Sequence, residues 1–123
     1  MTQEDKELLL KDLCARLPYN VKCYNSKYRS DLAEEIICIT VNYNHHCVQL
    51  GTYLYKLEQV KPYLFPLSSM TEEEKLMYEG LMIGTDNIPY MLDVIDWLNS
   101  HHFDYRGLIE KGLAIDATEL NIY

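Results

Sequence analysis

Apolar residues near the start of the chain recur at the three- and four-residue spacing of one helix face. Thr2 stands three residues before an acid, and acids follow it in the first turn, where the helix dipole favours negative charge. Pro18 ends the pattern because its ring cannot continue a helix. We therefore expect a helix between Thr2 and Pro18, with an apolar side made of Leu9, Leu10, Leu13, Cys14 and Leu17.

Beyond this helix the pattern changes to β-branched and aromatic residues, divided by clusters of Asn, Ser and Gly. We expect strands at Val21–Tyr24, Glu35–Tyr43 and Cys47–Tyr55. The second of these is apolar at successive positions, which is typical of a central strand buried on both faces. Its neighbour in sequence, Asn42–His46, has the asparagines of a hairpin loop.

The segment Val60–Tyr63 contains Pro62, which has no N–H to give to a sheet. We therefore expect it to be an edge strand at most. Together the strands predict a small antiparallel sheet, which a strong curl would turn into a partial barrel.

The second half of the chain has helical signals. Thr71 followed by three glutamates is the signature of a capping box, and the apolar spacing continues to Met82, with a stop expected near Gly84. Pro89 fits the first turn of another helix. Leu108–Gly112 indicates a short fourth helix ended by glycine. The fold class predicted is α+β in one domain, residues 1–123: an N-terminal helix, the sheet, then two or three helices packed over it.

Composition supports a folded single domain, with 48% hydrophobic and 24% charged residues in 123. The net charge of −8 is uneven: residues 1–69 hold eight acids and eight Lys or Arg, whereas residues 70–123 hold eleven acids and three bases. Such a surface repels nucleic acid and favours basic partners, although solubility alone is its commoner explanation. A nucleic-acid partner is therefore not expected.

The first residues are too charged for a signal peptide, and no apolar run approaches the roughly 20 residues that span a bilayer. We expect a cytoplasmic protein with no membrane association. Its four cysteines, none in a CxxC pair, are then expected to be reduced thiols.

The stretch NSHHFDYRG, Asn99–Gly107, holds the densest set of candidate catalytic groups. Two interpretations are open. If the stretch is structural, His101 and His102 lie beside the apolar face at a helix C-terminus, Asp104 caps the next helix, and Arg106 pairs with a nearby acid. If the stretch is functional, a histidine acts as a general base oriented by Asp104, or binds zinc together with His45, His46 and Cys47. We favour the structural interpretation. No nucleotide, hydrolase or metal motif is present, so we expect no catalytic residue, cofactor or metal.

Two other groups of residues are candidate binding sites. The first mixes cations with aromatic faces that suit a nucleotide or other anion, although it also fits a solvated hairpin edge. Its members are Lys22, Tyr24, Lys27, Tyr28 and Arg29. The second would contact a protein partner through an aromatic loop, which is more often a cover for its own core, and through the acidic helices. Its members are Tyr63, Phe65, Glu72, Glu73, Asp93 and Asp96.

Three blocks of the sequence resemble a group of small proteins of unassigned function from gut Bacteroides genomes and their phages and mobile elements. They are KELLLKDLCARLPYNVK, VKPYLFPLSSMTEEEK and DWLNSHHFDYRGLIEKGLAIDA, about half of the chain, and they flank a middle part, roughly Asn25–Leu57, that does not match. The resemblance implies no particular site residue. It favours an accessory protein that binds a protein partner, ahead of a small-molecule binder and of a histidine- or metal-dependent hydrolase.

Overall fold

The computed structural model describes residues 1–27, 33–41, 46–83 and 88–123. Within these ranges the chain forms an α+β fold, as expected, with three α-helices and a seven-stranded sheet. The helices are α1 (Gln3–Arg16), α2 (Glu72–Met82) and α3 (Ile88–Ser100). The strands are β1 (Lys22–Asn25), β2 (Glu34–Val41), β3 (His46–Leu50), β4 (Tyr53–Lys56), β5 (Val60–Pro66), β6 (Phe103–Asp104) and β7 (Ile115–Asp116).

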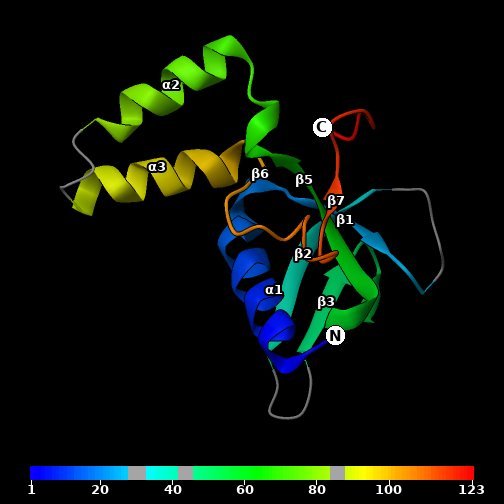
Figure 1. Ribbon diagram of the computed structural model, residues 1–123. Coiled ribbons are helices and arrows are strands. Elements are labelled where there is room, and N and C mark those ends of the chain that lie inside the picture. Colours follow the sequence, from blue (N-terminus) through cyan, green and yellow to red (C-terminus); the bar gives the residue numbers. More distant parts are fainter. Residues whose placement is uncertain (28–32, 42–45, 84–87) are drawn as a thin grey trace.

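The N-terminal helix α1 forms where the sequence predicts it. The Thr2 side chain accepts a hydrogen bond from the Asp5 backbone N–H at 3.0 Å, and the Asp5 carboxylate accepts one from the Thr2 N–H. Leu9 and Leu13 are completely buried. They press α1 against one face of the sheet, which the helix covers in Figure 1.

The sheet is larger than predicted and mixed. Its strand order is β4-β3-β2-β1-β5-β6, with β7 also paired to β5. Strands β1 to β5 pair in antiparallel fashion, whereas β6 and β7 run parallel to β5. The described strands form an open sheet and not a closed barrel, because β4 and β6 end the order without pairing to each other.

The single strand expected at Cys47–Tyr55 was wrong, since the chain turns back at Gly51. Gly51 has a φ of 59°, a left-handed conformation that glycine adopts without strain, and Leu50 pairs with Tyr53 across the turn. The result is a two-residue hairpin between β3 and β4. The hairpin loop expected at Asn42–His46 lies outside the described residues except for His46, which begins β3.

The expectation that Val60–Tyr63 is at most an edge strand was also wrong, because β5 pairs on both sides. The Ser26 N–H donates to the Gln59 carbonyl, which places Gln59, Lys61 and Tyr63 toward β1 in the alternation of the strand. The Pro62 nitrogen therefore points toward the other edge, where β7 pairs only from Tyr63 onward. No ladder hydrogen bond is lost at the proline.

Strand β2 is central, as predicted, but it is not buried on both faces. Ile36 points into the core, whereas Ile37 is 55% exposed on the opposite face. A register shift between Ile36 and Cys38 interrupts the pairing with β3. The sheet therefore has one covered face and one open face.

The short helix expected at Leu108–Gly112 is a turn. Gly107 and Gly112 both have positive φ, so only four residues lie between two left-handed positions, too few for a helix. The Asp104 carboxylate accepts hydrogen bonds from the backbone N–H groups of Leu108 and Ile109, both at 2.9 Å. Asp104 was predicted to cap a helix; in the structure its carboxylate instead binds the backbone of a turn.

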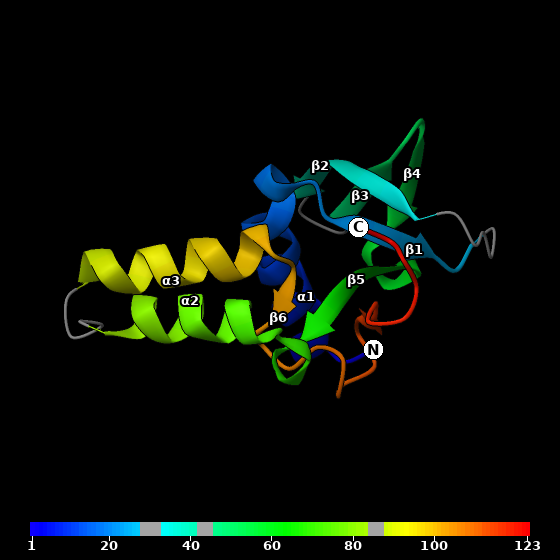
Figure 2. The same cartoon turned by 90° about the horizontal axis from the view of Figure 1, so that it is seen from above.

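Helices α2 and α3 lie side by side and project from the sheet instead of packing over it, as both views show (Figures 1 and 2). We call this pair the helical arm. Thr71 caps α2, accepting from the Glu74 N–H at 3.1 Å while the Glu74 carboxylate accepts from the Thr71 N–H, so the predicted capping box is confirmed. A separate core cluster at the base of the arm contains Met70, Val94, Leu98 and Phe103.

A buried ion pair connects α1 to the base of the arm. Asp12 and Arg16 are both 0% exposed, and the Arg16 Nε lies 2.7 Å from the Asp12 Oδ2. The Arg16 Nη2 donates to the Phe103 carbonyl at 2.7 Å, and the Arg106 Nε lies 3.4 Å from the other Asp12 oxygen. Two arginines and one carboxylate thus join α1 to the distant segment of residues 103–106.

The substitution Asp12→Ala tests how much this ion pair contributes to the stability of the fold. We expect it to lower the free energy of unfolding by about 3–5 kcal/mol, because Arg16 would stay buried without its counter-charge. Urea unfolding followed by circular dichroism measures the change. Glu58→Ala is the control, since it removes the surface pair between Lys6 and Glu58 and should cost less than about 1 kcal/mol. Similar small losses in both variants would contradict the central role of the pair.

Candidate functional site

The two histidines of the Asn99–Gly107 stretch face different ring systems. The His101 ring is tilted by 31° against the Trp97 ring, with 4.5 Å between centroids, and its Nδ1 lies 3.0 Å from the Trp97 carbonyl oxygen. The His102 ring stacks on the Tyr123 ring, with 3.8 Å between centroids. His102 itself has a φ of 61°, and its carbonyl accepts a hydrogen bond from the Phe65 N–H at 2.8 Å. Both rings act as packing elements at the end of α3.

The geometry does not assemble a catalytic dyad from these residues. Both Asp104 oxygens accept backbone N–H groups of the following turn, so this carboxylate orients no imidazole. Arg106 pairs with an acid, as predicted, but the acid is Asp12 of α1. Within the residues that the structure describes, no three metal-ligating side chains come together. His45, one of the candidate zinc ligands, lies outside them.

The Tyr123 side chain, on which His102 stacks, is bonded to two strands of the sheet. The backbone N–H of Lys22 donates to the Tyr123 hydroxyl at 2.9 Å, and that hydroxyl donates to the Tyr63 carbonyl at 2.8 Å. Lys22 and Tyr63 would be the next opposed residues of the β1–β5 ladder, so the hydroxyl replaces one rung of the sheet. Burial raises the pKa of Tyr123. The ring thus fixes the last described segment against β1, β5 and His102.

The candidate anion site around β1 is only partly described. The Lys22 Nζ donates to the Ile122 carbonyl at 2.9 Å and lies 5.8 Å from the centre of the Tyr123 ring. The Lys22 ammonium group is therefore already bound to the C-terminal segment. Tyr24 is half-buried on β1 and Lys27 is exposed, while Tyr28 and Arg29 lie outside the described residues. Anion binding at this edge stays a prediction.

The candidate partner residues divide into a buried and an exposed group. Tyr63 is only 6% exposed, and the half-buried Phe65 ring lies 6.3 Å from Phe103 and 5.8 Å from Tyr123. Both residues lie on strand β5 and not on a loop, so the expectation of an aromatic loop was wrong. Their rings pack against the protein's own core, the commoner of the two interpretations. The acidic members of the group are all exposed on the helical arm: Glu72, Glu73, Asp93 and Asp96.

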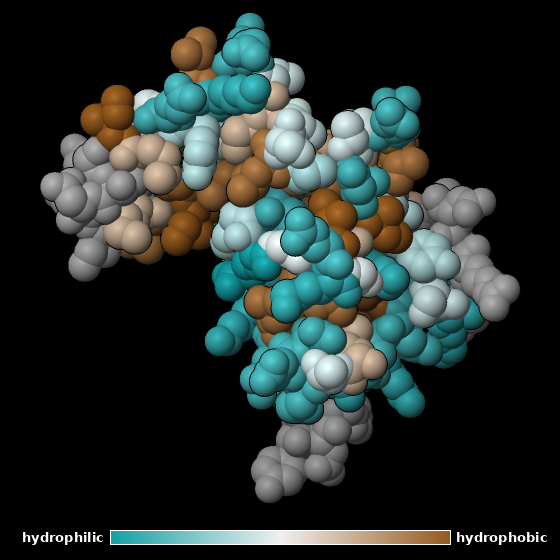
Figure 3. All heavy atoms as spheres, viewed as in Figure 1, coloured by the Kyte–Doolittle hydropathy of each residue, from teal (hydrophilic) through white to brown (hydrophobic). Residues whose placement is uncertain are grey.

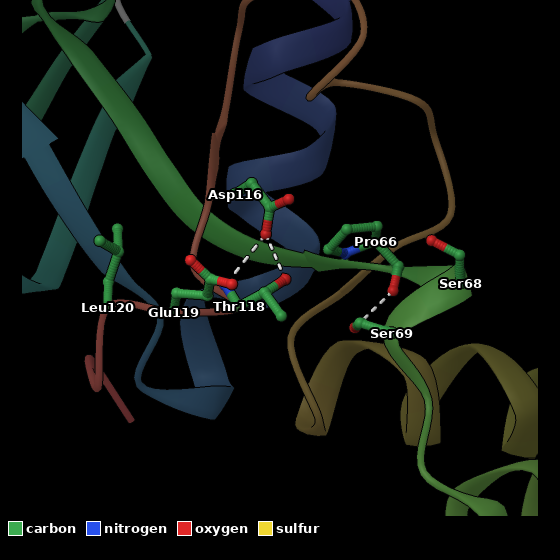
Figure 4. Close-up of a pocket in the computed structure, with 7 residues that line it drawn as sticks. All are labelled: Pro66, Ser68, Ser69, Asp116, Thr118, Glu119 and Leu120. Atoms are coloured by element: carbon green, nitrogen blue, oxygen red, sulfur yellow. Dashed lines mark hydrogen bonds between the residues drawn. The ribbon is translucent and has the colours of Figure 1, made fainter.

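A pocket of about 520 Å³ lies between the end of β5 and the C-terminal segment (Figure 4). Its polar groups are largely bonded to each other. The Ser69 hydroxyl donates to the Pro66 carbonyl at 2.7 Å, and both the backbone N–H and the hydroxyl of Thr118 donate to Asp116. Glu119 and Leu120 complete the wall with Ser68. The described lining holds hydroxyls and carboxylates but no base aimed at a nucleophile.

A second hollow of about 220 Å³ adjoins this pocket, with Ser69 and Thr118 common to both. It reaches the N-terminus of α2, where Thr71 and Glu74 line it. These two side chains are already bonded in the capping box, and the His101 Nδ1 lies against the Trp97 carbonyl. These polar groups of the hollow are therefore engaged in hydrogen bonds within the protein.

The helical arm presents the most unusual surface of the described molecule. Of the fifteen large hydrophobic side chains that are exposed among the described residues, seven belong to the arm. In the space-filling view, apolar atoms lie on both the upper and the lower side of the projecting helices (Figure 3). The seven residues are Leu76, Met77, Met82, Ile83, Met91, Leu92 and Ile95.

Comparison of the chain with protein-family models, with curated proteins and with solved structures gave no match. Among the described helices, none has the length and apolar character needed to cross a membrane.

The sequence reasoning missed Asp12, Arg16 and Tyr123. Asp12 and Arg16 share the helix face of Leu9 and Leu13, and two charges of opposite sign on an apolar face signal a buried pair. That signal was available in the sequence. The role of Tyr123 was not, because its partners lie about sixty and one hundred residues away.

The variant His102→Asn tests the packing role of this histidine through pH. Burial, with the nearby cations Arg16, His101 and Lys22, lowers the pKa of His102 to about 4. An unfolded histidine titrates near 6.5, so between these values the unfolded chain binds a proton that the folded chain refuses. Stability should therefore fall as the pH drops through this window, by about 1–2 kcal/mol after allowance for solvent screening.

Urea unfolding between neutral pH and about pH 4.5 measures this fall. Asparagine tolerates the left-handed backbone at this position, so the variant should fold and lose part of the pH dependence. Burial also raises the pKa of Asp12, despite its two arginine neighbours, but that contribution is common to both proteins and cancels in the comparison. Identical pH slopes would show that His102 is not shielded.

Proposed function

We propose that this protein is a non-enzymatic binding protein that attaches to a protein partner through its helical arm. The observation that carries the proposal is the presence of seven exposed large hydrophobic side chains on two helices that project from the sheet. Clusters of exposed apolar side chains with a polar rim mark interaction sites more often than they serve a monomer. The arm also projects from the body, so a partner can reach it.

The charge of the arm supports the same proposal. Residues 70–100 hold seven acids and one lysine. Acidic side chains around an apolar centre steer a complementary partner during encounter and reject acidic surfaces. The arm therefore combines exposed apolar side chains with acidic ones, and both kinds of group occur in protein interfaces.

We also propose the cytoplasm as its compartment and a Bacteroides-type bacterium or its phage as its source. All four cysteines are free, including the exposed Cys14, which fits a reducing environment. The source rests on the resemblance of the three sequence blocks described above.

Capture from a Bacteroides lysate tests the function, with the full chain as bait. The arm variant carries Leu76→Ser and Leu92→Ser, and the control carries Ile37→Ser and Leu54→Ser on the open face of the sheet. All four side chains are exposed, so each change should alter stability by less than about 0.5 kcal/mol. We expect at least one protein to be captured by the wild type and the control, and reduced roughly tenfold with the arm variant, the equivalent of about 1.4 kcal/mol.

Quantitative mass spectrometry of the captured proteins gives the readout, and thermal unfolding verifies that both variants are folded. If every protein captured by the wild type is retained by a folded arm variant, the arm is not the binding surface and the proposal fails.

A further inference from the structure

The side of α2 that faces away from α3 carries one continuous apolar stripe. Leu76 is 70% exposed and Ile83, which follows the last turn, is 79% exposed, the highest values for large hydrophobic side chains in the described chain. Gly80 lies between them, four residues after Leu76 and three before Ile83, so the three positions follow one side of the helix. Tyr78 and Leu81 occupy the opposite side and pack at the base of the arm. We call Leu76, Gly80 and Ile83 the α2 stripe.

Gly80 gives the fold no advantage that the structure shows. A Cβ added to it would meet nothing within 4 Å, and its φ is not in the left-handed region. A glycine inside a helix lowers stability by about 0.5–1 kcal/mol relative to alanine. Between two large side chains, however, it leaves a notch into which the ridge of another helix can fit.

Carboxylates accompany the stripe along α2. Glu72, Glu73 and Glu79 are all exposed, and the only ion pair described on this helix joins Lys75 to Glu72 at 3.7 Å. A second copy of the chain docked on the stripe would bring two such sets of acids together, which like-charge repulsion disfavours. A partner rich in Lys and Arg would instead be attracted to these carboxylates.

We propose that the α2 stripe is the docking site for a basic amphipathic helix of a protein partner. The apolar side of that helix packs over the notch at Gly80 between Leu76 and Ile83. Its Lys and Arg side chains pair with Glu72, Glu73 and Glu79. This is the helix-in-groove mode of recognition, in which apolar anchors are spaced by three and four residues. The inference rests on the proposed function and adds the chemistry of the partner.

The dimensions of α2 define the kind of complex. A helix of 11 residues is about 16 Å long, so it offers about three turns to a partner. A contact of this size lies at the small end of protein interfaces, where binding is transient. Weak binding that responds strongly to salt is therefore expected.

Two synthetic peptides of roughly 18 residues probe the site, a length that allows helix formation. One is an amphipathic helix of leucine and lysine, and the other replaces every lysine with glutamate. Chemical-shift changes in the isotope-labelled full chain locate the contact, and fluorescence anisotropy gives the affinity. We expect shifts from the lysine peptide at residues 72–83 and none from the glutamate peptide.

Two variants and a matched control separate steric from electrostatic contributions. Gly80→Leu fills the notch in open space and raises helix propensity, so it should leave the fold intact and weaken the lysine peptide at least tenfold. The triple change Glu72→Gln, Glu73→Gln and Glu79→Gln should weaken it at least fivefold. The control Glu4→Gln, Glu7→Gln and Glu110→Gln removes the same charge from exposed sites elsewhere and should change affinity less than twofold.

Each contrary result overturns the inference. Shifts centred outside α2, equal effects of the charge variant and its control, or unchanged affinity of Gly80→Leu would each exclude this site. Sedimentation showing a wild-type dimer and a monomeric Gly80→Leu variant would identify a second copy as the occupant. If lysate capture still depends on the arm while these tests fail, the proposed function stands and only the partner's chemistry is wrong.

Discussion

The guanidinium of Arg16 holds together segments that the chain keeps far apart. It pairs with Asp12 within α1 and donates to the carbonyl of Phe103, where β6 joins the base of the helical arm. Because both charges are completely buried, each requires the other, and neither can be satisfied by water. The position of α1 on the sheet and the origin of the arm are therefore defined by the same interaction.

The two parts that this interaction joins, the body and the helical arm, differ in how far their apolar side chains are buried. The body combines the covered face of the sheet with α1, and its core reaches complete burial at residues such as Leu13 and Leu64. The arm has only a small cluster at its base and exposes apolar side chains along most of its length. Stability thus resides mainly in the body, which leaves the arm free to carry a surface that a stable core would have buried.

The histidine-rich stretch illustrates how dense polar chemistry can be structural. The His101 ring packs against Trp97, the His102 ring stacks on Tyr123, and Asp104 accepts hydrogen bonds from the backbone of a turn that has a glycine at each end. These groups stabilise the junction between body and arm. The surface that we propose for binding lies on the outer side of α2, where a glycine and two aliphatic side chains are accompanied by exposed glutamates.

The sequence alone determined the elements whose signals are local. The capping boxes at Thr2 and Thr71 and the helical spacing after them defined α1 and α2, and the acidic bias of the arm was visible from composition. Tertiary structure decided the rest, because it depends on partners distant in the chain. Pro62 fits an interior strand only because its nitrogen faces away from β1, and Tyr123 completes a rung between Lys22 and Tyr63. Whether a helix face is covered or open depends on where its neighbours fold, which periodicity cannot specify.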